Sequence, residues 1–149
     1  MEPGKKILQS FADAYEIDGF PPLAGKIMGV FYLSEKEHLS FEEIIQQTEA
    51  SKGAVSKSLN QLIQLKRVNY VVSEESHRKR LFYLDTKGII HFVKMMINNY
   101  KQQDALLRKC LVLRNDKDSD LYQFIENSIA FNADVLATLD EKADQYFKK

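Results

Sequence analysis

Cysteine, proline and tryptophan are scarce in this 149-residue chain, which has one Cys, three Pro and no Trp. A single cysteine, Cys110, excludes an intramolecular disulfide and favours a reducing compartment. Because Cys110 lies among the leucines of the segment 106–111, we expect a small buried hydrophobe rather than a redox-sensing thiol. No segment approaches the roughly 18 apolar residues of a membrane span or the core of a signal peptide. We therefore expect a cytoplasmic protein without a membrane partner.

The residues that catalysis and metal binding require are also missing. The three histidines, His38, His77 and His91, have no metal-ligand spacing such as H-x-x-x-H. No glycine-rich phosphate loop and no G-x-S-x-G element is present. The sequence predicts that the protein is not an enzyme and has no cofactor and no metal site.

Net charge is absent overall but not locally, since 21 basic residues balance 21 acidic ones. Residues 1–50 carry 4 basic and 9 acidic side chains, residues 51–80 carry 7 basic and 2 acidic, and residues 81–149 carry 10 of each. The excess positive charge is thus confined to 51–80. Such a local excess is typical of a surface that binds phosphates.

The segment 51–64 reads as an amphipathic helix that Ser51 caps. Val55, Leu59, Leu62 and Ile63 recur at helical spacing and form its apolar face. The other face has the residue types that contact bases and phosphates. These candidate DNA-binding residues are Ser51, Lys52, Gly53, Ser56, Lys57, Asn60 and Gln64.

A short helix precedes this segment, because Ser40 and Glu43 form a capping box, and this helix should end near Thr48. Two helices joined by three or four residues form a helix-turn-helix. Strands are predicted at 68–72 and 80–84, with a polar tip at 73–79. This hairpin would be a basic wing, and it adds the candidates His77, Arg78, Lys79 and Arg80.

Three segments of the chain resemble the MarR family of bacterial transcriptional regulators: 51–66, Arg78-Lys79-Arg80 and 84–88. Residues 19–29, followed by 51–56, resemble the branch that includes repressors of glycine-betaine synthesis and uptake. Many members have an Asp where this chain has Ser76. The resemblance covers nearly the whole chain. It implies a winged helix-turn-helix repressor that is released or modulated by a small-molecule effector.

The expected fold is mainly α with a small β-hairpin wing, in one MarR-like domain that spans 1–149. Residues 18–88 would form the winged-helix DNA-binding lobe, and 1–17 and 89–149 the dimerisation helices. Helices are predicted at 4–17 and 22–33, from Asp85 through about Leu111, and at 119–146. A lobe of about 65 residues is too small to bury the apolar stripes of the last two helices, which favours a homodimer over a helical pair folded back on its own lobe.

Together these patterns predict a sequence-specific regulator that binds a pseudo-palindrome of double-stranded DNA as a homodimer. The alternative is a winged-helix module for protein-protein interaction, in which the lysines only solvate a helix face. The resemblance implies an effector between the dimerisation helices and the lobe. Phe11, Tyr15, Phe92 and Tyr100 are candidates for an aromatic cage, although aromatics at helical spacing usually belong to a core. The residues of the effector site stay unknown.

Overall fold

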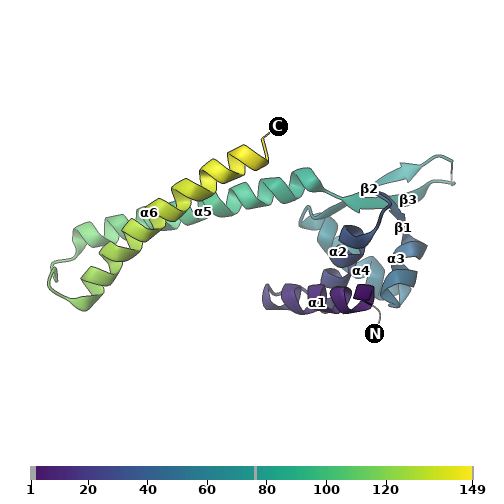
Figure 1. The fold of residues 1–149 in the computed structure, drawn as a ribbon, viewed down its shortest axis with the longest axis horizontal. Coiled ribbons are helices and arrows are strands. Elements are labelled where there is room, and N and C mark those ends of the chain that lie inside the picture. Colours follow the sequence, from purple (N-terminus) through teal and green to yellow (C-terminus); the bar gives the residue numbers. More distant parts are fainter. Residues whose placement is uncertain (1–2, 76, 149) are drawn as a thin grey trace. The chain divides into compact units, whose positions relative to one another are not determined.

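The computed structural model describes residues 3–75 and 77–148 (Figure 1). Ser76 of the predicted wing tip, and residues 1, 2 and 149 of the predicted dimerisation segments, lie outside the described residues. The chain divides into two compact units, Met1–Ile89 and Ile90–Lys149. The first unit contains a helical lobe with a small sheet, and the second is a helical hairpin.

Two antiparallel-packed helices open the first unit, α1 (Pro3–Ile17) and α2 (Pro22–Leu33). Gly19, at φ +88°, turns the chain after α1, and the Phe20 amide donates to the Tyr15 carbonyl at 3.0 Å. Pro22 occupies the first position of α2, where its missing amide hydrogen has no cost. Both helices lie where the sequence predicted them, within one residue at each end.

The helix-turn-helix consists of α3 (Phe41–Thr48) and α4 (Lys52–Gln64). Ser40 and Glu43 form the predicted capping box, with both hydrogen bonds at 3.1 Å. Glu49 ends α3 in the left-handed conformation, at φ 57°. The turn is therefore made without the glycine that this conformation usually favours.

The wing belongs to an antiparallel sheet in the order β1-β3-β2. Its strands are β1 (Leu39–Ser40), β2 (Val68–Ser73) and β3 (Lys79–Leu84). Leu39 pairs with Phe82, and the hairpin register runs from Val68 opposite Leu84 to Ser73 opposite Lys79. The hairpin was predicted one residue too short on each strand, and β1 was missed because two residues carry no alternation.

The core of the first unit lies between the helices and the sheet. Its largest fully buried side chains come from α2, α3, α4 and β2, and they are Ile27, Met28, Ile44, Val55, Leu59, Leu62 and Val68. Val55, Leu59 and Leu62 are three of the four positions that the sequence assigned to the apolar face of 51–64. The packing of this face fixes which side of α4 is left outside.

The second unit contains most of α5 (Thr86–Leu113) and all of α6 (Asp120–Tyr146), which Ser119 caps. The start of α5 lies in the first unit, where Asp85 Oδ1 accepts from the Gly88 amide at 2.9 Å. A Cβ at Gly88 would lie 2.2 Å from the Lys66 carbonyl oxygen. Only glycine therefore fits this close approach of α5 to the end of α4.

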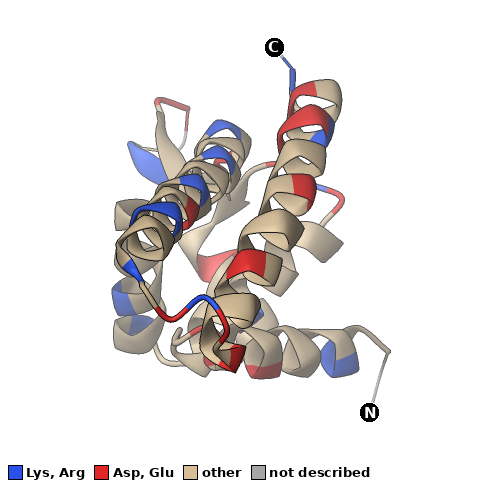
Figure 2. Ribbon diagram, turned by 90° about the vertical axis from the view of Figure 1, so that its left-hand side faces the viewer, with Lys and Arg blue, Asp and Glu red and all other residues tan. Residues whose placement is uncertain are grey.

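Charge accompanies the pairing of the two long helices. Basic residues mark α5 and acidic residues mark α6 (Figure 2). Lys101 pairs with Asp140, and Lys94 Nζ lies 3.8 Å from Asp144 Oδ1. The hairpin buries Ile97, Ile125, Ile129, Leu136 and Ala143. Cys110 is exposed, so the prediction of a buried thiol is wrong for the single chain, because the hairpin buries only a narrow stripe of each helix.

The predicted fold class is confirmed: mainly α, with a small β-hairpin wing and a winged helix-turn-helix lobe. The role of α1 stays a prediction. This helix packs on α2 in the first unit through Leu8 and Ala12, while Ile7 and Ile17 are exposed on it.

Candidate nucleic-acid interface

The outer face of α4 is built by its cap and its buried stripe. The Ser51 side chain accepts from the Ala54 amide at 3.2 Å, which fixes the start of the helix. Val55, Leu59 and Leu62 then anchor α4 to the core. All seven residues that the sequence predicted for this surface are exposed: Ser51, Lys52, Gly53, Ser56, Lys57, Asn60 and Gln64.

The wing extends beyond the helices of its unit as a two-stranded ribbon (Figure 1). At its tip the Arg78 amide donates to the Ser73 carbonyl at 2.9 Å. His77 and Arg78 both adopt the left-handed conformation, at φ 56° and 61°, which strains residues that have a Cβ. All four predicted wing residues, His77, Arg78, Lys79 and Arg80, are exposed.

Arg80 has a contact that the sequence did not suggest. Its guanidinium carbon lies 4.5 Å from the centroid of the Tyr70 ring on β2. Such a cation–π contact holds the planar group in place while its edge donors stay available for phosphate. Lys79 and Arg80 both belong to β3, on the strand side of the tip as predicted.

A hollow of about 280 Å³ joins the helix and the wing into one surface. Leu59 and Asn60 of α4 lie on one side of it, and Lys79, Arg80 and Phe82 of β3 on the other. Ser56 completes the α4 side, and Phe41 and Glu42 of α3 close the hollow. Four of the predicted residues thus come together, although they are up to 24 positions apart in the sequence.

Of the four lining residues that the sequence did not predict for this surface, Leu59 and Phe82 belong to the core, and Phe41 and Glu42 come from α3. The capping box placed both in the first turn of α3, but a helix start alone does not show which way its side chains point. Their place beside Asn60 depends on the angle between α3 and α4, which the core sets. The sequence signal that could have indicated Glu42 was its negative charge shortly before the basic segment 51–80.

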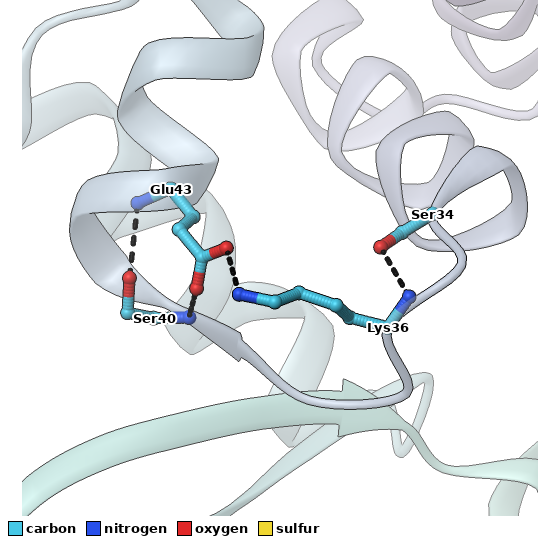
Figure 3. A network of polar contacts seen from close by, with 4 residues as sticks. All are labelled: Ser34, Lys36, Ser40 and Glu43. Atoms are coloured by element: carbon cyan, nitrogen blue, oxygen red, sulfur yellow. Dashed lines mark hydrogen bonds and ion pairs between the residues drawn. The ribbon is translucent and has the colours of Figure 1, made fainter.

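A polar network supports α3 away from that hollow (Figure 3). Lys36 Nζ donates to Glu43 Oε2 at 2.7 Å, and Glu43 Oε1 accepts from the Ser40 amide. The Lys36 contact, followed by the Ser40 hydrogen bond, lowers the pKa of Glu43. Lys36 and Glu43 also line a cavity of about 680 Å³ with Leu8, Val30 and Leu39.

The four aromatics suggested for an effector cage belong to different environments. Phe11 stacks on Tyr32 with ring centroids 5.8 Å apart, and Tyr15 packs edge-on to Phe20 at 5.4 Å. Burial raises the pKa of Tyr15. Both rings therefore take part in the packing of the first unit, whereas Phe92 and Tyr100 belong to the second unit. An effector site stays a prediction.

Residues 3–75 and 77–148 contain no group of three or more His, Cys, Asp or Glu side chains that would hold a metal ion. Within the same residues, no helix has both the length and the apolar character that a membrane crossing needs.

A scan against protein-family models finds no match, and a search of curated proteins finds none. Among solved structures, a transcriptional regulator is 17% identical, with a TM-score of 0.64 and coverage of 99% of this chain and 100% of the other. Staphylococcus aureus MepR, a transcription regulator of the multidrug efflux pump MepA, has a TM-score of 0.46, 18% identity and coverage of 91% of each chain. Escherichia coli MarR has a TM-score of 0.44, 15% identity and coverage of 95% and 87%. This chain shares the fold of the first of these structures over 99% of its length.

Proposed function

We propose that this protein is a sequence-specific DNA-binding transcriptional regulator of the MarR type that acts as a homodimer on a pseudo-palindromic operator. The observation that carries the proposal is the shared hollow between α4 and the wing. It gathers Ser56, Asn60, Lys79 and Arg80 on one exposed surface. Amide, hydroxyl and cationic groups on one helix face and one adjacent ribbon match a duplex, which presents base edges beside phosphates.

The residues divide into two roles. Lys57 and Asn60, in the middle of the outer face of α4, are suited to base edges in the major groove. Ser51, Lys52 and Ser56 lie in or near the first turn, where side chains contact the backbone and fix the register. Gly53 has no atom within 4 Å of the position of a Cβ, so a flat surface can approach the helix there.

Homodimerisation is supported by the apolar surface of the second unit. Phe124, Phe131, Val135 and Leu139 of α6 recur at spacings of seven and four, which places them along one side of the helix. All four are exposed in the single chain, from 37% for Val135 to 67% for Phe131. A second copy would cover such a stripe with an identical one, as a two-fold interface requires.

The sign of regulation and the effector rest on the resemblance alone. It points to repression, in the manner of the branch that regulates glycine-betaine synthesis and uptake, and to release or modulation by a small molecule. A ligand that binds the DNA-free arrangement better would lower operator affinity by that difference.

Enrichment of duplexes from a random pool, followed by a salt titration, tests the function. Neutralised phosphates should give a slope of log affinity against log salt of about −0.9 per contact. The double variant Lys52→Ala/Lys57→Ala should make this slope shallower. The control Lys94→Ala/Lys109→Ala removes equal charge from α5 and should leave the slope unchanged. A protein that enriches no sequence and binds no duplex would instead be the protein-interaction module.

A further inference from the structure

The surface that we propose to bind DNA includes one acidic side chain among the residues that line its hollow. Glu42, the second residue of α3, lines the hollow together with Ser56, Asn60, Lys79 and Arg80. It is exposed. Within the described residues its carboxylate has no hydrogen bond and no ion pair, even though a lysine and an arginine share the hollow with it. Arg80 is held over the ring of Tyr70 instead.

The neighbouring residue, Glu43, differs from Glu42 because its carboxylate is fully hydrogen-bonded. Both oxygens of Glu43 are occupied, one by the Ser40 amide and one by Lys36 (Figure 3). Glu43 also lines the cavity of about 680 Å³ with residues of α1 and α2 rather than the hollow beside α4. Glu43 thus stabilises the start of α3, and the cap does not need Glu42. Glu42 adds its charge to the first turn of α3, but it takes part in none of the hydrogen bonds of the cap.

A carboxylate at this place affects two DNA groups in opposite ways. It repels phosphate oxygens, which carry like charge and surround a duplex wherever the protein lands. It accepts hydrogen bonds from amino groups on base edges, above all the N4 amino group of cytosine. A neutral side chain in the same hollow would remove this repulsion, and a basic one would attract any backbone, whatever the sequence.

We propose that Glu42 is a specificity-determining residue that keeps phosphate out of the hollow between α4 and the wing and accepts an amino group of a base edge there. This inference rests on the proposed DNA-binding function. Glu42 lowers the affinity for random duplexes, in which backbone contacts dominate, more than the affinity for the preferred site. The acidic first turn of α3 and the basic outer face of α4 together set the specificity ratio, which is the affinity for the preferred site divided by the affinity for random DNA.

The test compares Glu42→Gln with the wild type on the enriched duplex and on a random duplex of the same length, over a range of salt concentrations. Glu42→Gln should raise affinity for the random duplex by about 3- to 10-fold, because a dimer carries the change twice. The salt slope on random DNA should become steeper, and affinity for the enriched duplex should stay unchanged or fall. Glu42→Asp keeps the charge and should keep the specificity ratio.

The matched control is Glu35→Gln, which removes the same charge from the same unit. Glu35 lines the cavity beside α1 and α2, away from the hollow, so its loss should change both affinities little. Helicity of Glu42→Gln should match that of the wild type, and its thermal midpoint should fall only slightly, because the Ser40–Glu43 cap is retained while one charge is lost from the first turn of α3.

Three results would overturn the inference. One is an equal change on both duplexes, and another is an effect of Glu42→Gln no larger than that of Glu35→Gln. In either case the wild type still binds DNA, so the proposed function survives. If the wild type binds no duplex at any salt concentration, the proposed function fails and the inference fails with it.

Discussion

Among the predicted DNA-binding residues, Asn60 should contribute most to the recognition of a specific base. It is exposed in the middle of α4 and lines the hollow beside the wing. An amide can form a bidentate pair with adenine, whereas its hydrogen bond to a phosphate carries no sequence information. Asn60→Ala should therefore cost about 1–3 kcal/mol on the preferred duplex. Binding to random DNA should change little, and an equal loss on both duplexes would reassign Asn60 to backbone positioning.

Arg78 and Lys79 are neighbours in the wing with different expected roles. Arg78 lies at the tip, in the left-handed conformation, where a guanidinium can enter a narrow A/T-rich minor groove. Lys79 begins β3 and is suited to phosphate. Arg78→Ala should weaken binding most on sites with A/T-rich flanks. Lys79→Ala should weaken all duplexes alike and make the salt slope shallower by about one unit.

Equal weakening of every duplex by both variants would make Arg78 another phosphate anchor. The affinities are best measured by fluorescence anisotropy on duplexes that differ only in their flanks. The same measurements on Arg80→Ala show whether the contact with Tyr70 leaves this side chain free to bind phosphate.

The backbone conformation of four residues could not be predicted from the sequence. Gly19 was predicted to turn left-handed and does. Glu49, Lys66, His77 and Arg78 also have positive φ values without being glycine. Local propensity disfavours that conformation for each of them. Each of them lies in a short connection between two elements, and the turn that joins those elements requires the conformation although no glycine marks it in the sequence.

Among the elements, α1 and α2 depend on glycine for their close crossing. A Cβ at Gly25 would lie 2.5 Å from the Phe11 carbonyl oxygen and 2.9 Å from the Ala12 Cα. Gly25→Ala must push two helix backbones apart and should cost about 1–3 kcal/mol of unfolding free energy. Gly4→Ala is the control, because nothing lies within 4 Å of its Cβ position. Urea unfolding should show no loss of unfolding free energy for this control. Equal losses for Gly25→Ala and Gly4→Ala would contradict the requirement for glycine where α1 and α2 cross.

The start of α3 should respond to acid. Lys36 and the Ser40 amide lower the pKa of Glu43 below its ordinary value of 4.5. Ionised Glu43 therefore stabilises the folded state above about pH 4.5, and this contribution disappears as the pH falls through the lowered pKa of the folded state. Glu43→Gln should therefore lose less unfolding free energy than the wild type between pH 7 and about pH 3.5, as measured by urea unfolding at both pH values.

Lys36→Met should have an intermediate effect, since the Ser40 amide still holds the carboxylate. At pH 7 its cost should stay below about 1 kcal/mol, because the pair with Glu43 is partly exposed. Identical acid profiles for the wild type and both variants would contradict the coupling.

Elements with strong local signals were predictable, and those set by long-range pairing were not. The capping box at Ser40 and the cap at Ser51 fixed the starts of α3 and α4 from a few adjacent residues. In contrast, β1 exists because Leu39 and Ser40 pair with Phe82 and Leu81, more than 40 positions away. The exposed side of α4 followed from its apolar period. The hollow it shares with β3 depends on tertiary packing.

At the scale of the whole molecule, two long helices bury little of their apolar surface within one chain. Met95, Leu106 and Leu113 of α5 recur at spacings of 11 and 7, which keeps them on one side of that helix, and all are exposed. Asp104, a buried charge of the hairpin, is already satisfied, since it accepts from Asn132 and Arg108, each at 3.2 Å. The apolar stripes are therefore the surface that still needs a partner.

Sedimentation at micromolar concentration should therefore give about twice the chain mass of 17.2 kDa. Phe131→Glu places a charge in the α6 stripe and should shift the protein toward monomer. Ala137→Glu, on the opposite side of α6, is the control and should stay dimeric. In the dimer the two α4 helices should enter major grooves about one helical turn apart. Phe131→Glu should then lose its preference for an inverted repeat over a single half-site, and a wild-type monomer would contradict the dimeric arrangement.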